Sequence, residues 1–176
     1  MATKRKYVRA WHWVGETLRD GSPIPKDGEW LEYKGPLQMC KSGLHASRNP
    51  FDALQYAPGA TLCLVDCDGI GAEQQDKLVS SRRRIVARMD ATELCRYFGR
   101  QQAIGVLDNW ETEPEQCVLD WLMCDDNAES AAWNAARSAA ESAAESAAWN
   151  AARSAARSAA KDEFTQLVYE CFEDWL

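Results

Sequence analysis

The two histidines of this chain are its clearest candidates for chemistry at neutral pH, because imidazole changes charge near that pH. His12 stands in AWHWVG, a predicted strand whose alternation puts Trp11 and Trp13 on the opposite face. His45 stands in GLHAS, at the end of a predicted strand and just before a helix, where side chains often line a cleft. Each histidine has a plainer alternative role, as a hydrogen-bonded residue of the core.

The cysteines and the familiar catalytic motifs add no further candidate. The chain has 7 cysteines and no signal-peptide pattern at its N-terminus, so we expect free thiols in a reducing cytoplasm. Cys63 and Cys67 are four residues apart and Cys40 lies near His45, but neither spacing is the C-x₂-C pattern of zinc, and we predict no metal. No P-loop, G-x-G-x-x-G, G-x-S-x-G or H-E-x-x-H occurs, and nothing ties a serine or cysteine nucleophile to a base.

These residues must be positioned by a compact α+β domain, which we expect over residues 1–126 with packed helices and a small mixed or antiparallel sheet. Alternating or apolar runs predict strands at KYVRAWHWV, ATLCLVDCDG and KLVSSRRRIVARMD, and WLEY and LQMC are short strand candidates. We expect the second of these strands, which is short and apolar, to end at Gly69. Asn49 can cap a helix that has Pro50 at its first position, and further helices are predicted in DATELCRYFGRQQAIGVLDNW and EPEQCVLDWLMC.

Residues 127–161 form an Ala-rich segment that repeats every four residues. Alanine has the highest helix propensity and no Gly or Pro interrupts the segment, so it predicts a long helix, as one rod or as a hairpin. Each step of four turns the repeat by roughly 40° about the axis, so Trp133 and Trp149 point to nearly opposite sides. Like charges stand four apart, as in Glu141 and Glu145, so pairing within the helix does not explain them. The alternatives are a solvated spacer made by tandem duplication and a helix that binds a partner or a second copy.

Residues 162–176 predict a C-terminal amphipathic helix, which must bury its apolar face somewhere. That face comprises Phe164, Leu167, Val168, Cys171, Phe172, Trp175 and Leu176. The candidate partner-binding residues of the repeat and this helix are Trp133, Arg137, Trp149, Arg153, Arg157 and Trp175.

The net charge of −7 and the pI near 4.9 disfavour broad binding to nucleic acid. Acidic residues crowd 108–126, and basic residues gather near the N-terminus and at Arg82, Arg83 and Arg84. A charge run of this kind is usually a solvated face. No apolar run approaches the length of a membrane span, so we expect no membrane association and a cytoplasmic protein.

The stretch from AWHWVG to TLCLVDCDG, together with DKLVSSRRRIVAR, resembles an uncharacterised domain common in phages and prophages. GLHAS matches that family's Gly-[Phe/Leu]-His-Ala motif, and DALQY matches the helix that follows it. Ala/Trp/Arg repeats like the one found here often trail such domains. The resemblance covers roughly residues 7–107 and implies a phage or prophage accessory protein.

A second resemblance is to the ADP-ribosyltransferase fold. GLHASRNPFDALQY is similar to its Gly-Ile-Tyr-Phe-Ala…Tyr segment, and AWHWVGETLRDG stands in for its first-strand histidine motif. The resemblance implies His45 in the place of the tyrosine, Tyr56 as the ring that stacks on nicotinamide, and His12 on the ribose. These three would be catalytic, and with Ser47 they would bind NAD. No glutamate on a clear later strand matches the carboxylate that activates the ribose in that family.

The favoured hypothesis is a non-enzymatic phage-type protein that binds, and so modulates or inhibits, a host or defence protein complex. The alternative is an ADP-ribosyltransferase-like enzyme that uses NAD, or a nucleotide-binding protein with a degenerate pocket of that kind. A homo-oligomer formed through the Ala-rich and C-terminal helices is compatible with either hypothesis.

Overall fold

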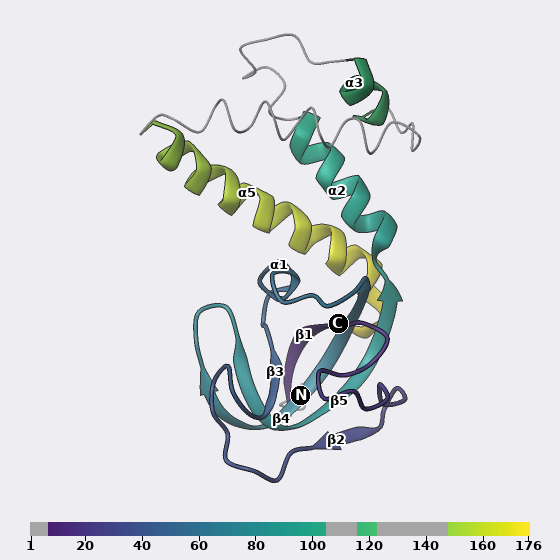
Figure 1. The fold of residues 1–176 in the computed structure, drawn as a ribbon, viewed down its shortest axis with the longest axis vertical. Helices are drawn as coiled ribbons and strands as arrows, with labels where there is room; N and C mark the ends of the chain where they lie inside the picture. The colour runs from purple at the N-terminus through teal and green to yellow at the C-terminus, as the bar shows by residue number, and fades with distance from the viewer. Residues whose placement is uncertain (1–6, 105–115, 123–147) are drawn as a thin grey trace, which may run out of the picture. The chain divides into compact units, whose positions relative to one another are not determined.

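The computed structural model describes residues 7–104, 116–122 and 148–176 (Figure 1). The described residues fall into two compact units. One contains the chain up to Glu93 together with Lys161–Leu176, and the other contains the described part of Leu94–Ala160. The predicted α+β class is confirmed, with helices and a five-stranded sheet in which every strand pairing is antiparallel.

The sheet belongs to the first unit. β1 (Val8–Val14), β4 (Thr61–Glu73) and β5 (Leu78–Asp90) form its centre, with β4 and β5 joined as a long hairpin. Two short strands, β2 (Trp30–Glu32) and β3 (Leu44–Ala46), both pair with β5, β3 near its start and β2 further along. The order is therefore β1-β4-β5-β2, with β3 beside β2 along the same edge of β5.

One backbone contact curls this sheet. Ser47 directly follows β3 and exchanges two backbone hydrogen bonds with Trp11 of β1, at 2.7 and 2.9 Å. Because β3 pairs with β5 and its extension meets β1, the path β1–β4–β5–β3 returns to β1. The curled sheet has an inner face and an outer face.

Alternation along the strands assigns side chains to these two faces. Ala10 and Val14 of β1 belong to one buried apolar cluster, which marks the inner face, and His12 lies between them on that face. Trp11 and Trp13 lie on the outer face, as the sequence predicted, and both are buried. The inner cluster comprises Ala10, Val14, Ala46, Cys63, Val65, Cys67, Leu78 and Ile85.

Two of the predicted strand limits are wrong. β4 does not end at Gly69 but continues to Glu73, with a register shift against β5 just after the glycine. Gly69 has a φ of 63°, and a Cβ placed there would lie 2.1 Å from Ser81 Oγ, so glycine lets the strand continue through a left-handed backbone position. The segment LQMC is no strand, because Gln38 makes only an isolated bridge to Ser42 within a tight turn.

The helix after GLHAS forms as predicted. α1 spans Pro50–Leu54, and the side-chain oxygen of Asn49 accepts hydrogen bonds from the backbone N–H groups of Phe51 and Asp52 at 2.9 and 3.4 Å. This is the N-cap arrangement that the Asn-Pro pair favours. The remaining helical elements are α2 (Thr92–Ile104), α3 (Gln116–Leu122), α5 (Ala148–Cys171) and the short η3 (Glu173–Trp175).

α5 is one uninterrupted helix across Lys161 and Asp162, where the sequence analysis divided the Ala-rich repeat from the C-terminal helix. The repeat before Ala148 lies outside the described residues. From Lys161 onward the helix packs on the outer face of the curled sheet, and Phe172 meets Trp11 edge-on with ring centroids 5.0 Å apart. Among the described helices, none combines the length and the apolarity needed to cross a membrane.

Candidate functional site

His12 lies on the inner face of the curled sheet, opposite Cys63 of β4. Its side chain is largely enclosed. Burial, followed by the positive charge of Arg83 and the proximity of His45, holds the pKa of His12 well below the usual range of histidine. His12 is therefore a neutral imidazole at physiological pH.

Arg83 is a buried cation that the sequence analysis did not single out. Its guanidinium extends from β5 to the backbone of β3, where one N–H donates to the carbonyl oxygen of His45. Burial lowers the pKa of Arg83 from its ordinary value, although arginine stays charged. The three consecutive arginines were the available signal, because alternation along a strand must turn Arg83 away from Arg82 and Arg84.

His45 lies on the opposite side of β3 from Ala46, which belongs to the inner cluster. Its Nε2 accepts a hydrogen bond of 3.0 Å from the backbone N–H of Cys40, so the imidazole carries its proton on Nδ1. Burial lowers the pKa of His45, a backbone hydrogen bond at Gly43 partly offsets this, and the nearby charge of Arg83 lowers it further. Cys40 has a φ of 65°, the one positive value at a non-glycine residue in the described part of the chain.

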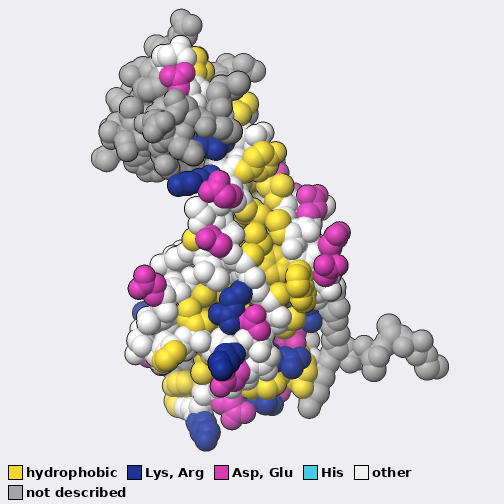
Figure 2. All heavy atoms as spheres, turned by 90° about the vertical axis from the view of Figure 1, so that its right-hand side faces the viewer, with side chains coloured by type: hydrophobic (Ala, Val, Ile, Leu, Met, Phe, Trp, Pro, Cys, Tyr) yellow, Lys and Arg dark blue, Asp and Glu magenta, His cyan; other side chains and the backbone are white. Residues whose placement is uncertain are grey.

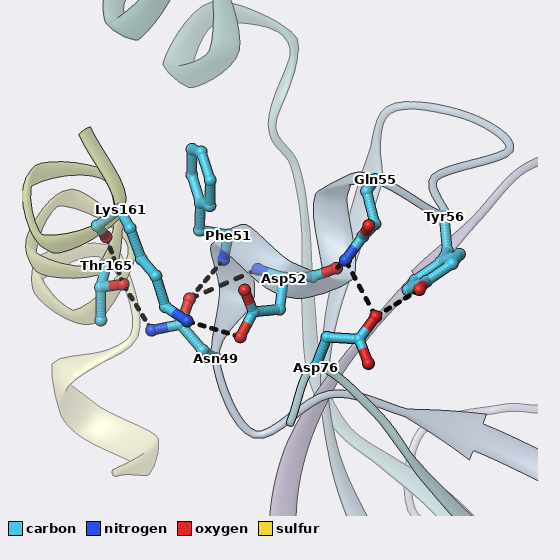
Figure 3. A network of polar contacts seen from close by, with 8 residues as sticks. All are labelled: Asn49, Phe51, Asp52, Gln55, Tyr56, Asp76, Lys161 and Thr165. Atoms are coloured by element: carbon cyan, nitrogen blue, oxygen red, sulfur yellow. Dashed lines mark hydrogen bonds and ion pairs between the residues drawn. The ribbon is translucent and has the colours of Figure 1, made fainter. Parts of the chain in front are cut away.

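A polar cluster joins His45 to Tyr56 through two residues that the sequence analysis did not predict. The Nζ of Lys77 donates to the Tyr56 oxygen at 3.0 Å and also lies near the side chain of Cys40, whose backbone N–H donates to His45. Tyr56 in turn donates to Asp76 in the β4–β5 turn (Figure 3). These hydrogen bonds raise the pKa of Lys77, with Tyr56 as the largest cause, so Lys77 is an ammonium ion rather than a nucleophilic amine.

The four residues predicted to bind NAD are thus distributed over three places. His45 and Tyr56 make no direct hydrogen bond to each other in the described residues, and Cys40 and Lys77 lie between them. His12 lies on the inner face. Ser47 is buried, and its backbone is committed to the pairing with Trp11.

The buried thiols of Cys63 and Cys67 have low reactivity. Burial raises the pKa of Cys63 and of Cys67 to about 11, so both are neutral thiols at physiological pH. Across residues 7–104, 116–122 and 148–176, no three His, Cys, Asp or Glu side chains are grouped as ligands for a metal ion.

A second constellation fixes the C-terminal half of α5 to α1 (Figure 3). Lys161 Nζ lies 2.7 Å from a carboxylate oxygen of Asp52, and the side-chain amide of Asn49 donates to the Thr165 hydroxyl at 2.9 Å. Asn49 therefore caps α1 with its oxygen and holds α5 with its nitrogen. Beside these contacts the ring of Phe164 meets Phe51 edge-on at 5.9 Å.

The predicted partner-binding residues are only partly described. Trp133 and Arg137 lie outside the described residues. Trp149 and Arg153 lie within α5, Arg157 on the same helix is exposed, and Trp175 is 47% exposed beside Phe172.

Comparison with known proteins adds a family. A family model described as a domain of unknown function (DUF7666) matches residues 8–97, which is 90 of the 176 residues. The chain belongs to the DUF7666 family. The match covers all five strands and α1, including His12, His45 and Arg83, whereas α5 lies outside it. No curated protein and no solved structure matches the chain.

Proposed function

We propose that the protein is a non-enzymatic binding module, in which the DUF7666 sheet anchors α5 and this helix contacts a second protein. The observation that carries the proposal is the change of environment along one continuous helix. Phe164, Val168 and Phe172 are buried on the sheet, whereas Arg157, Ser158 and Ala159, between one and two turns earlier, are exposed. A helix that is already folded and fixed at one end presents an ordered binding surface. Binding then costs less conformational entropy than it would if the helix had to fold on contact with the partner.

The partner that we propose is a host or defence protein complex, which the binding would modulate or inhibit. This part rests on the resemblance to phage and prophage domains that GLHAS and DALQY carry. The mixed surface favours a protein partner over a polyanion: on the side shown in Figure 2, Lys and Arg side chains lie beside Asp and Glu side chains rather than in a separate field.

Affinity purification from host lysate with the full chain as bait tests the proposal. Arg153→Ala/Arg157→Ala keeps the helix, because alanine is the best helix former, but removes two charges from α5. We expect one protein complex to be enriched by the natural chain and lost with this double variant. His12→Gln/His45→Gln is the matched control and should retain the complex. Enrichment that both variants retain, or both lose, would contradict the proposal.

The NAD-dependent alternative has a separate readout. Incubation of the full chain with labelled NAD and host lysate would give a transferred label if the chain were a transferase of the ADP-ribosyl type. A label that disappears with His12→Ala and with His45→Ala would replace the binding proposal by the enzymatic one. Light scattering on the purified chain measures the predicted self-association, independently of the affinity purification and of the NAD experiment.

A further inference from the structure

Arg83 is the one arginine of β5 without a carboxylate partner among the described residues. On the same strand, Arg82 pairs with Asp68 at 3.2 Å and Arg84 with Asp66 at 2.9 Å. Arg88, near the end of the strand, pairs with Asp27. Yet Arg83 is the most buried of the four, at 7% exposed. A buried charge is costly unless an opposite charge or several hydrogen bonds compensate it, and the His45 carbonyl supplies one hydrogen bond.

The groups around Arg83 add no negative charge. Cys67 faces it across the β4–β5 pair, and Cys67 and Cys63 are neutral thiols because burial raises their pKa. His12 and His45 are neutral, and the other charges that act on His45 are the cations Lys77 and Arg19. Asp76 lies 4.0 Å from the Nζ of Lys77 and so pairs with that cation rather than with Arg83. Among the described residues, the charge of Arg83 therefore has no carboxylate beside it.

The position of Arg83 combines enclosure with access. In the register of the sheet, Val8, Cys67 and Arg83 form one row across β1, β4 and β5. Val8, at the β1 end of this row, is partly exposed, so the row reaches solvent there. A guanidinium presents five N–H donors in a planar fork that matches the two oxygens of a phosphate or carboxylate group.

We propose that Arg83 is the charged centre of an oxyanion-binding site on the inner face of the curled sheet, which takes the phosphate or carboxylate group of a small ligand. His12, on the same face, is the second donor. A bound anion favours the protonated form of a nearby imidazole, so by linkage the site binds its ligand more tightly as the pH falls toward the ordinary pKa of histidine. The charged groups that oppose this protonation are Arg83 at both histidines, and Lys77 and Arg19 at His45.

Thermal unfolding of the full chain tests the site with inorganic phosphate and acetate as probes, each against KCl at equal ionic strength. A ligand that binds the native state raises its unfolding temperature in a saturable manner. We expect this saturable rise with phosphate, acetate or both, and the stronger of the two probes identifies the ligand group. Arg83→Met should weaken the apparent affinity by at least about tenfold, as loss of a charged hydrogen-bond donor does. Arg82→Met, on the same strand but facing outward with ordinary partners, should leave it unchanged.

A measurement on the natural chain keeps the proposal testable if Arg83→Met does not fold. The C2–H signals of the two histidines are followed by proton NMR against pH, with and without the probe. We expect the pKa of His12 to rise when the anion is bound. Equal unfolding temperatures in all three salts, an unmoved His12 titration, or an undiminished response of folded Arg83→Met would overturn the proposal.

Discussion

At the scale of single residues, two imidazoles are held neutral inside a structure that places cations close to them. The folded-state pKa of His12 lies well below the unfolded value of about 6.5, and that of His45 is also lowered. Below about pH 6.5 the unfolded chain therefore binds more protons than the native chain. We expect stability that is complete above about pH 7 and that declines as the pH falls from about 6.5 toward the lowered folded pKa values, by at most about 1.4 kcal/mol per pH unit for His12.

Urea unfolding at several pH values between 5.5 and 7.5, in a buffer without phosphate, measures this decline. His12→Gln keeps a polar side chain but removes the titrating group, so its stability should depend less on pH over that window. A slope as steep in His12→Gln as in the natural chain would show that His12 is not the cause.

The free thiols give a second prediction at this scale. Cys40 and Cys171 are exposed, whereas Cys63 and Cys67 are buried and have a pKa of about 11. Because the thiolate is the reactive form, a maleimide should modify the exposed pair much faster than the buried pair in the native chain. Peptide mass spectrometry after timed labelling distinguishes them, and urea should abolish the difference. Labelling of Cys63 as fast as Cys40 would mean that the inner face opens readily.

At the scale of elements, the sequence predicted a strand or helix correctly where the residues of that segment alone determine its structure. The alternation of β1 placed His12 opposite Trp11 and Trp13, and Asn49-Pro50 marked the start of α1. Prediction from the sequence was wrong where the structure of a segment depends on residues that are distant in the chain. Gly69 was predicted to end the strand, but glycine is needed there because of its positive φ and the proximity of Ser81 on the neighbouring strand, neither of which the local sequence shows.

In the candidate site, too, local motifs predicted some residues, whereas others come from distant segments of the chain. GLHAS and DALQY located His45 and Tyr56, but the residues that connect them, Lys77 and Cys40, come from the β4–β5 turn and from a separate loop. No local pattern predicts that pairing. Arg83 could have been found from strand alternation, yet its lack of a carboxylate depends on every element that surrounds it.

The left-handed glycine in β4, Gly69, yields the element-scale prediction. Gly69→Ala forces a residue with a Cβ into a positive φ and places that Cβ 2.1 Å from Ser81 Oγ. We expect a loss of about 1–3 kcal/mol in the free energy of unfolding, from backbone strain together with the clash. Gly69→Ala/Ser81→Ala removes the clash but not the strain and should recover part of the loss, as measured by chemical denaturation. Equal stability of the two variants would assign the whole cost to the backbone.

At the scale of the whole molecule, one compact unit is assembled from segments more than 100 residues apart in the chain. Asn49 reaches Thr165 and Asp52 reaches Lys161, and the outer face that carries Trp11 is covered by residues from Lys161 onward. The DUF7666 match ends at residue 97, so the helix that covers this face lies outside the family's matched region. The sheet and the C-terminal half of α5 should consequently unfold together.

Phe164→Ala tests that cooperativity. Phe164 is fully buried, with its ring edge-on to Phe51 of α1, so truncation leaves a cavity where α5 packs on α1. We expect a loss of about 3–5 kcal/mol in the free energy of unfolding, with the far-UV helix signal and the near-UV tryptophan signal disappearing in one transition. Glu170→Ala, an exposed position on the same helix, should change stability by less than about 0.5 kcal/mol. If Phe164→Ala instead melted helix while the tryptophan signal stayed native, α5 would be an independent appendage. The helix could then not serve as the fixed arm through which the sheet presents a binding surface.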